Sequence, residues 1–426
     1  MTDALHGLIG LAVLVLIGVV LSENRRAIQP RVVLSALAAQ VAIGALALFV
    51  PWGRIALSRA AAAVNHVIEY GNKGVEFLFG GLVTAKMHEV FGDTGFVFAF
   101  RVLPAIIYVS ALIAVLYHMG VMRWIIVGLG TAFQRLIGVS KIESFSAVTT
   151  IFLGQSEMPA VLKPFVGQLR GTELFAIMTS GMAAVAGSTL AGYAGLGVRL
   201  DYLIAASFMA VPGGLLFAKI ICPGTGTSNV ALDNLYFDER PAANVIEATA
   251  AGAAVGLRVA VNVGAMLIAF IGVIALLDGL VGGLMAELGH PGVNLETLLG
   301  YAFAPLAWLI GVPWGQASIA GNLIAQKVIL NEFVGYAALS PYLRDHAAVV
   351  ASGLTALDAK TIAILSFALC GFANLSSIAI LTGGFGAVAP HLRPEIARYG
   401  LRVVAAASLS NLASATIAGF LLGSGA

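Results

Sequence analysis

Residues 154–159 read Gly-Gln-Ser-Glu-Met-Pro and bring an amide, a hydroxyl and a carboxylate into strongly apolar surroundings. Two further polar clusters interrupt apolar sequence in the same way: Asn331-Glu332, and the stretch from Asn374 to Ser377. Mean hydropathy is +0.96. Only 10% of the residues are charged, against about 25% in an ordinary soluble domain. An ionised carboxylate at bilayer depth is costly, so it pairs, titrates or faces a polar cavity. The three clusters are therefore candidates for a transport site in a membrane protein.

Eight charge-free apolar runs follow one another along the 426 residues. Each is close to the roughly 20 residues that a helix needs to span the hydrocarbon core. Backbone in lipid must hydrogen-bond to itself, and these runs lack the alternation of barrel strands, so we expect helices. The 50 glycines fit close helix packing in a membrane. The runs are Leu5–Leu21, Val32–Val50, Val102–Met122, Leu174–Val198, Tyr202–Ala218, Val259–Leu277, Thr361–Leu392 and Val403–Ala426.

The basic residues set the expected orientation, because short cytoplasmic loops carry an excess of Lys and Arg. Arg25, Arg26 and Arg31 follow the first apolar run, whereas Asp3 is the only charge before it. This pattern places the N-terminus outside and the first loop in the cytoplasm. The later basic clusters are expected in the cytoplasm as well, and the C-terminus outside. These clusters are Arg123, Arg135 and Lys141; Lys163 and Arg170; Lys219 and Arg240; and Arg393, Arg398 and Arg402.

Two segments are expected to enter and leave the membrane on the same face, as re-entrant hairpins. Ile142–Leu169 must return to the cytoplasm if the basic clusters on both sides of it lie there. Thr297–Gln326 carries no charge but is interrupted by Pro305 and by the sequence Gly-Val-Pro-Trp-Gly at 311–315, and proline with clustered glycine disrupts a helix. Each hairpin is followed by two spans. Such an inverted repeat builds midplane binding sites in secondary transporters.

The expected fold is therefore an all-α integral membrane protein with eight transmembrane helices, two opposed re-entrant hairpins and interfacial helices. The hairpin tips resemble each other weakly, with Gly154-Gln155 in the first and Gly315-Gln316 in the second. Arg54–Asp93 interleaves charged and apolar residues at helical spacing, which predicts helices lying at the membrane interface. An ordinary solvated loop is the alternative for this segment.

The polar tip of the first hairpin has two interpretations. Gln155, Ser156 and Glu157 together offer an amide, a hydroxyl and a carboxylate to a polar solute, beside half-helix ends whose backbone groups are unsatisfied. The alternative is a helix cap made by Ser156 or Glu157. A plain cap does not need a neighbouring glutamine in lipid, which favours the solute site.

The two later clusters also have alternatives. Glu332 is either a site residue or an interfacial charge among lipid headgroups, and Lys327 is not at the ideal helical spacing to neutralise it. Asn374 and Ser377 are three residues apart, so on one helix they share a face. For Ser377 the alternative is interhelical packing, whereas an embedded Asn374 has two donors and an acceptor to satisfy.

Other classes of function fit less well. A passive channel needs a continuous polar pore, whereas here the polar residues gather in a few clusters. An intramembrane enzyme could use Glu157 and Glu332 as an acid–base pair, but no nucleophile–base pair or metal motif accompanies them. The net charge of +2 carries no basic stripe for nucleic acid. Cys222 and Cys370 are too few for a disulfide framework.

Four motifs, in this order, resemble the signatures of the concentrative nucleoside transporter family. They are residues 154–159, Gly311-Val312-Pro313-Trp314, Asn331-Glu332-Phe333-Val334 and residues 370–377. The likeness runs over essentially the whole chain. It implies a symporter that imports nucleosides across a bacterial inner membrane, without enzymatic activity or a cofactor. It also implies a homotrimer in the lipid bilayer, in which a transport domain carrying both hairpins moves like an elevator against a scaffold.

The resemblance divides the chain into units. Scaffold helices are expected at 1–52, 94–122 and 245–286, and interfacial helices at 53–93. The first hairpin and its transport-domain helices are expected at 123–221, and the second hairpin with its helices at 287–426. Between them, residues 222–244 form a polar loop in the cytoplasm.

The resemblance also assigns residues to the two halves of a nucleoside. The tip residues Gln155, Ser156 and Glu157, which follow Gly154, match positions that contact the base, and so does Thr189, where most members are apolar. Glu332, Asn374 and Ser377 match positions that hold the ribose hydroxyls, and Phe372 matches an aromatic residue beside the ribose. A nucleoside is neutral, flat on one side and rich in hydroxyls on the other, so amide and carboxylate groups suit it.

The departures from the family concern the coupling ion. Sodium-coupled members carry Asn where this chain has Thr150, and Ser where it has Ala184. A sodium site near Thr150, Leu153, Ala184 and Val185 would therefore depend mainly on backbone carbonyls. We predict proton coupling, with sodium as the alternative. The candidate ion-coupling residues are Glu157, Glu332 and Thr150.

Overall fold

The computed structural model describes residues 3–84, 86–91, 96–224 and 242–423. Over these residues the regular structure is helical, without a β-strand, which confirms the expected all-α class. The α-helices are α1 (Asp3–Val20), α2 (Pro30–Leu48), α3 (Pro51–Phe79), α4 (Lys86–Phe91), α5 (Phe98–Arg101), α6 (Leu103–His118), α7 (Val121–Ile137), α8 (Lys141–Thr149), α9 (Met158–Leu162), α10 (Gly171–Ala183), α11 (Gly187–Gly195), α12 (Leu200–Ile221), α13 (Val245–Glu287), α14 (Leu295–Leu309), α15 (Trp314–Ile329), α16 (Glu332–Leu339), α17 (His346–Ala351), α18 (Ala359–Ala368), α19 (Ser376–Val388) and α20 (Arg393–Gly423).

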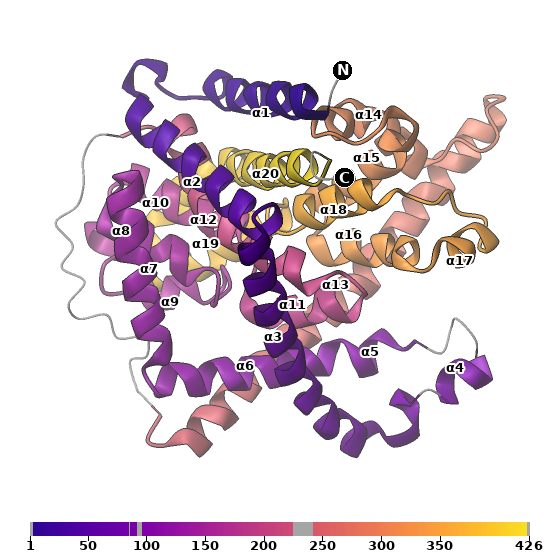
Figure 1. Ribbon diagram of the computed structural model, residues 1–426, viewed down its shortest axis with the longest axis horizontal. Helices are drawn as coiled ribbons and strands as arrows, with labels where there is room; N and C mark the ends of the chain where they lie inside the picture. The colour runs from indigo at the N-terminus through magenta and orange to yellow at the C-terminus, as the bar shows by residue number, and fades with distance from the viewer. Residues whose placement is uncertain (1–2, 85, 92–95, 225–241, 424–426) are drawn as a thin grey trace.

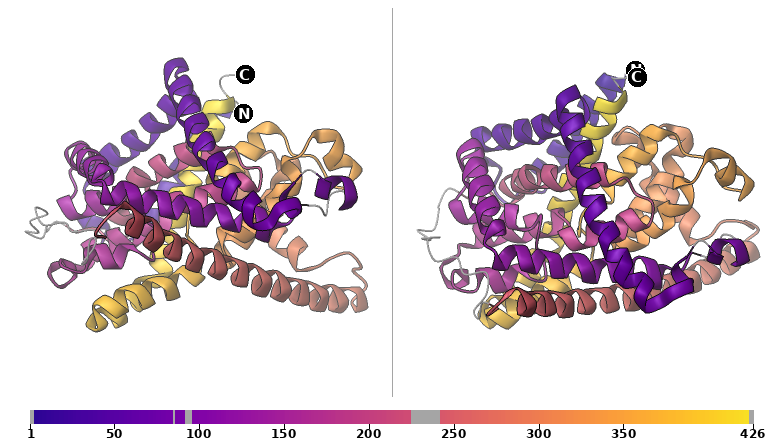
Figure 2. Two further views of the ribbon diagram at one scale, coloured as in Figure 1. Left: turned by 90° about the horizontal axis from the view of Figure 1, so that it is seen from below. Right: turned by 60° about the horizontal axis from the view of Figure 1, so that its bottom comes forward.

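The helices divide into a buried centre and an exposed flank. In their most apolar windows, 94% of the α10–α11 residues and 83% of those in α12 and in α20 are buried, against 17% in α13. α12 and α20 lie in the middle of the molecule (Figure 1). The long α13 runs along one side of it and packs against α6 (Figure 2). A membrane protein can expose apolar residues on such a flank, because lipid solvates them.

The apolar runs of the sequence appear as helices. Six segments in the described part are long and apolar enough to cross a membrane, and the bent pair α14–α15 is a seventh candidate. The chain is therefore a membrane protein. α13 is 43 residues long, well beyond the predicted run Val259–Leu277. Its start is stabilised by Asn244, whose side chain accepts a hydrogen bond from the Glu247 amide, a standard N-cap.

Two of the apolar runs are each broken into two helices. Leu174–Val198 becomes α10 and α11, which are separated by Ala184–Ala186, and Thr361–Leu392 becomes α18 and α19, separated by residues 369–375. Hydropathy does not reveal the breaks, because the residues at them are themselves mostly apolar. The breaks leave helix-end backbone groups inside the bundle, where they need other partners.

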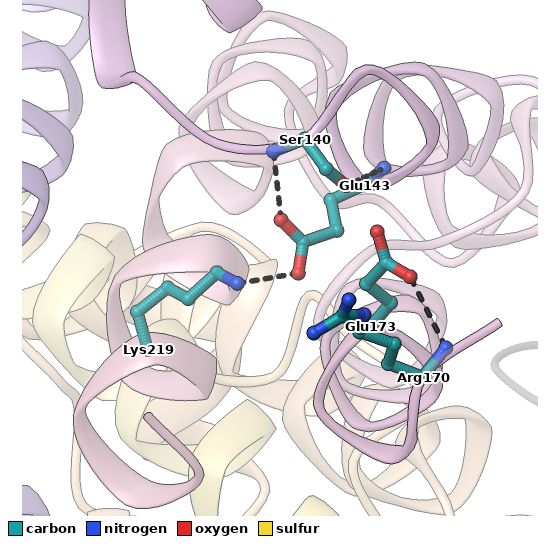
Figure 3. A network of polar contacts seen from close by, with 5 residues as sticks. All are labelled: Ser140, Glu143, Arg170, Glu173 and Lys219. Atoms are coloured by element: carbon teal, nitrogen blue, oxygen red, sulfur yellow. Dashed lines mark hydrogen bonds and ion pairs between the residues drawn. The ribbon is translucent and has the colours of Figure 1, made fainter. Parts of the chain in front are cut away.

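Both predicted hairpins are present. The first consists of α8, a tip at residues 150–157 and the short α9. Its base is anchored by Glu143, which accepts a hydrogen bond from the Ser140 amide at 2.9 Å and pairs with Lys219 of α12 (Figure 3). The second hairpin is α14–α15, bent by 113° at its tip. Each hairpin precedes a broken helix and a long helix, so the order expected of a repeat is observed.

Three further segments can be compared with the predictions from sequence. The basic stretch around Arg123 and Arg135 forms the helix α7, which the sequence analysis did not predict. The segment Arg54–Asp93 is helical in α3 and α4, which removes the solvated-loop alternative for its larger part. The predicted polar loop at 222–244 falls mostly on residues 225–241, which lie outside the described part of the chain.

Candidate functional site

One cavity of about 200 Å³ collects the polar clusters of the sequence. All nine predicted binding residues line it, and they come from the first hairpin, the first turn of α11, the second helix break, and the starts of α16 and α19. The lining residues are Gly154, Gln155, Ser156, Glu157, Ala186, Ser188, Thr189, Val259, Asn262, Val263, Met266, Asn331, Glu332, Phe333, Phe372, Asn374, Ser376, Ser377 and Ile380. Val259, Asn262, Val263 and Met266 come from α13, so one wall belongs to the exposed flank and the rest to the buried centre.

The first hairpin presents its tip to this cavity. Gln155 is 5% exposed, and its Nε2 donates to Ser377 Oγ at 2.7 Å. Its Oε1 is buried and accepts no hydrogen bond from the described residues, so it can accept one from a ligand. Glu157 stands at the start of α9 but makes no side-chain cap there. Instead its Oε2 accepts the Gly154 amide at 2.5 Å and closes the tip, which disfavours the capping interpretation.

The carboxylate of Glu332 reaches the cavity from the start of α16. Asn331 is the N-cap of α16, and its Oδ1 accepts the Val334 amide at 2.9 Å, which fixes the start of the helix at Glu332. Glu332 is only 4% exposed, so it is not an interfacial charge. Its Oε1 accepts from the Tyr193 hydroxyl and its Oε2 from Asn374 Nδ2, both at 3.1 Å. A buried carboxylate needs such donors.

Asn374 corrects one prediction. It was expected to share a helix face with Ser377, but it lies in the break before α19. Its Oδ1 accepts the Ser377 amide at 2.9 Å and the Ser376 hydroxyl at 2.7 Å, so its side chain closes the start of that helix. The Ser377 hydroxyl in turn donates to the Phe372 carbonyl at 2.6 Å. Ser377 is therefore part of the site network as well as of the packing.

These contacts form one continuous chain of hydrogen bonds. It runs from Gln155 through Ser377 and Asn374 to Glu332 and ends at Tyr193. Sequence reasoning missed Tyr193, although it stands four residues after Thr189 and hence near it on one face of α11. Side chains joined in this way hold one another's rotamers, so the polar wall of the cavity is organised before a ligand arrives.

The predicted ion-coupling residues are placed differently. Glu157 and Glu332 line the cavity, whereas Thr150, Leu153, Ala184 and Val185 do not. The Thr150 hydroxyl donates to the Ala147 carbonyl at 2.7 Å. The hairpin tip nevertheless touches the first helix break, because the Gly187 amide donates to the Phe152 carbonyl at 3.4 Å. Within the described residues, no cluster of three His, Cys, Asp or Glu side chains has a metal-binding arrangement.

The cavity fits a neutral solute with a polar and an apolar part. Amide, hydroxyl and carboxylate groups line one side, and Val263, Phe372 and Ile380 contribute apolar surface. Ligand sites of this kind are apolar overall, with a few polar groups that fix orientation. The arrangement is that of a binding site for a polar molecule that also carries an apolar face.

Family models identify the class. Residues 202–419 match the model "Na+ dependent nucleoside transporter C-terminus", residues 9–82 match its N-terminal counterpart, and residues 99–199 match "Nucleoside recognition". The chain belongs to the concentrative nucleoside transporter family, whose members are transporters and not enzymes.

Individual relatives agree with this assignment over their full length. The chain is 51% identical over 421 residues to the putative nucleoside permease NupX of Escherichia coli, covering 99% of each chain. It is 48% identical over 422 residues to the nucleoside permease NupC of Helicobacter pylori, covering 99% of this chain and 98% of the relative. The inward-facing, substrate-bound structure of CNTnw superposes with a TM-score of 0.93 at 51% identity, over 99% of this chain and 100% of that chain.

Proposed function

We propose that this protein is a secondary active symporter that imports nucleosides across the bacterial inner membrane, driven by a proton gradient. The hydrogen-bonded chain from Gln155 to Glu332 carries the proposal. One end offers the Gln155 Oε1 acceptor, which suits the N–H groups of a base. The other end holds a carboxylate, which suits ribose hydroxyls as donors. The names of the E. coli and H. pylori permeases support the same substrate class.

Within this site we assign the base to Gln155, Ser156, Glu157 and Thr189, and the ribose to Glu332, Asn374 and Ser377, with Phe372 beside the sugar. The arrangement supports this division for two residues, because Gln155 begins the hydrogen-bonded chain and Glu332 lies three contacts further along it, beyond Ser377 and Asn374. Thr189 Oγ1 donates to the Ala186 carbonyl at 2.7 Å, so its hydroxyl offers only acceptor capacity to a ligand. We expect it to favour bases that present a donor there.

Proton coupling is supported by the oxygens around the first helix break. Ala184 has no side-chain oxygen, and its carbonyl already accepts the Phe372 amide at 3.3 Å. The Thr150 hydroxyl donates its proton to the Ala147 carbonyl within the hairpin, so its oxygen can act only as an acceptor. Sodium needs several oxygen ligands, whereas an embedded carboxylate favours its protonated form. Glu157 and Glu332 are the proposed proton carriers. Sodium coupling remains the alternative, in line with the description of the family model.

The coupling ion can be tested in proteoliposomes loaded with buffer of defined pH. An inward proton gradient without sodium should drive accumulation of labelled uridine, and added sodium should change the rate little. As a control, a protonophore that collapses the proton gradient should abolish the accumulation. Accumulation of uridine against its own concentration gradient excludes a passive channel. The double variant Thr150→Asn with Ala184→Ser should gain sodium dependence. Uptake that needs sodium and ignores the pH gradient would overturn the proton proposal.

We further propose a homotrimer with both termini outside. Support for the trimer comes from the flank, where α13 exposes large apolar residues along most of its length, a surface that neighbouring protomers or lipid can cover. In this arrangement, residues 123–221 and 287–426 move as the transport domain against a scaffold. The mass of the detergent-solubilised protein, measured with correction for bound detergent, tests the trimer. Labelling of single cysteines placed near each terminus in intact cells tests the orientation.

A further inference from the structure

Lys327 is a buried basic residue that does not line the cavity. It stands in the last turn of α15 and is 1% exposed. Glu332 is the nearest acidic residue along the chain, yet within the described residues no ion pair joins the two. Instead the Lys327 ammonium donates to Asn411 Oδ1 of α20 at 2.9 Å. An ionisable group inside a membrane protein is costly, so its presence points to a function.

The amide of Asn411 extends this contact to both helix breaks. Its Nδ2 donates to the Ala183 carbonyl at 2.7 Å and to the Cys370 carbonyl at 2.9 Å. Ala183 is the last residue of α10, and Cys370 lies two residues beyond the end of α18. The C-terminal ends of α10, α15 and α18 thus meet at one amide. Helix C-termini carry partial negative charge, which an ammonium group complements.

The side-chain amide of Asn411 is tightly packed, and there is no space for a side chain on the neighbouring Gly371. A Cβ atom built on Gly371 would lie 2.3 Å from Asn411 Oδ1 and 2.7 Å from the Ala183 carbonyl oxygen. Asn411 is 2% exposed. Beyond it, the Phe372 amide donates to the Ala184 carbonyl at 3.3 Å, so the two breaks are also joined to each other. Thr189 follows the first break in α11, and Phe372 and Asn374 lie within the second break.

We propose that Lys327 and Asn411 are positioning residues of the binding site: an ammonium–amide contact that holds the two helix breaks in register. They touch no ligand, because neither lines the cavity. They act on the site through the backbone that starts at Ala183 and Cys370. The proposal rests on the proposed nucleoside site for its effect on affinity, but not for its effect on the backbone.

Binding of labelled uridine to purified variants tests the effect on affinity. Lys327→Met keeps the volume of the side chain and removes its charge, and Asn411→Leu removes the amide. Each should weaken binding by about 10-fold or more, since buried polar groups lose their partners. The double variant should bind no more weakly than Asn411→Leu, because that variant already removes the acceptor of Lys327. Lys327→Gln keeps a donor and should lose less, by about 3-fold.

Gln40→Leu is the matched control. Gln40 is fully buried on α2, and its Nε2 donates to Ser414 Oγ of α20 at 2.9 Å. Ser414 is close to Asn411 in sequence, but neither Gln40 nor Ser414 lines the cavity. Gln40→Leu should lower the melting temperature as the other variants do, yet leave uridine affinity within about two-fold. Unchanged affinity in Lys327→Met and Asn411→Leu, or an equal loss in Gln40→Leu, would overturn the proposal.

Hydrogen exchange provides a readout without nucleoside. Lys327→Met and Asn411→Leu should speed amide exchange in residues 184–189 and 371–377, whereas Gln40→Leu should leave these segments unchanged. If the unmodified protein binds no uridine, the proposed function fails, and the exchange rates still decide whether the contact holds the breaks. Equal exchange in those segments in all variants would contradict it.

Discussion

The two hairpins share a place in the repeat but use their tips differently. The first places Gln155 at the cavity, where its amide bonds to Ser377 across 222 positions of sequence. The second keeps the residues of its tip out of the cavity. Its matching glutamine, Gln316, accepts the Asp358 amide at 3.3 Å in an exposed contact. The residues that this side of the repeat contributes to the cavity wall, Asn331 and Glu332, follow the second hairpin in sequence. Similar sequence at related positions therefore does not carry the same role.

The bases of the hairpins differ as well. The first is held by the pair of Glu143, which is 1% exposed, and Lys219. The second is held at its entry by Asp278 of α13, which accepts Asn294 Nδ2 at 3.0 Å in a partly buried contact. Removing one partner of a buried ion pair costs far more than removing one partner of a partly exposed hydrogen bond. The hairpin that presents its tip is thus also the one with the stronger electrostatic anchor.

The largest effect is expected from the residue after the second hairpin. Glu332→Ala should weaken uridine binding by about 100-fold or more, because Tyr193 and Asn374 are left as buried donors without their acceptor and the sugar loses a carboxylate. Asn374→Ala should act in the same direction. Equilibrium binding to the purified protein measures both. Near-normal affinity in the two variants, with an intact fold, would remove the ribose assignment.

The two matched glutamines give the direct comparison. Gln155→Ala should lower uridine affinity by about 10-fold, since a buried amide leaves the site and Ser377 Oγ loses a donor. Gln316→Ala, at the corresponding tip, should change affinity by less than about two-fold, because its contact is exposed. The same binding assay compares both variants with the unmodified protein. Equal losses would mean that the tips are equivalent after all.

The ligand can be changed instead of the protein. Deoxyuridines that lack the 2′- or 3′-hydroxyl should compete about 10-fold less well than uridine, because the missing hydroxyl leaves polar groups of the site unpaired. The loss should shrink in Glu332→Ala and persist in Gln155→Ala, which separates the sugar side from the base side. Equal competition by all three nucleosides would show that these residues do not recognise the sugar.

The smallest effect on affinity is expected at the hairpin bases. Lys219→Met leaves Glu143 as an uncompensated buried charge, which costs about 3–5 kcal/mol. The melting temperature in detergent should fall clearly, with uridine affinity in the remaining folded protein within about two-fold. Asp278→Asn, at the other base, should lower the melting temperature much less. The double change Glu143→Gln with Lys219→Met should recover part of the loss, and a double variant as unstable as Lys219→Met would argue against the anchor.

Much of the fold could be predicted from local composition. Apolar runs of about 20 residues predict spanning helices because lipid solvates no backbone, and proline with clustered glycine predicts the second hairpin. The helix breaks in Leu174–Val198 and Thr361–Leu392 could not be predicted from hydropathy, because they consist mostly of apolar residues. For the same reason Asn374 was placed on a helix face, although it lies in a break.

The sequence by itself determined the membrane class, the two hairpins and nine of the residues that line the cavity, because hydrophobicity and charge are properties of each residue and its neighbours. Tertiary structure decided the partners: Gln155 with Ser377, Glu332 with Tyr193, and Lys327 with Asn411 rather than Glu332. A hydrogen bond requires a donor and an acceptor within about 3 Å at a suitable angle. Only the folded chain brings together groups that lie 84 to 222 positions apart in sequence.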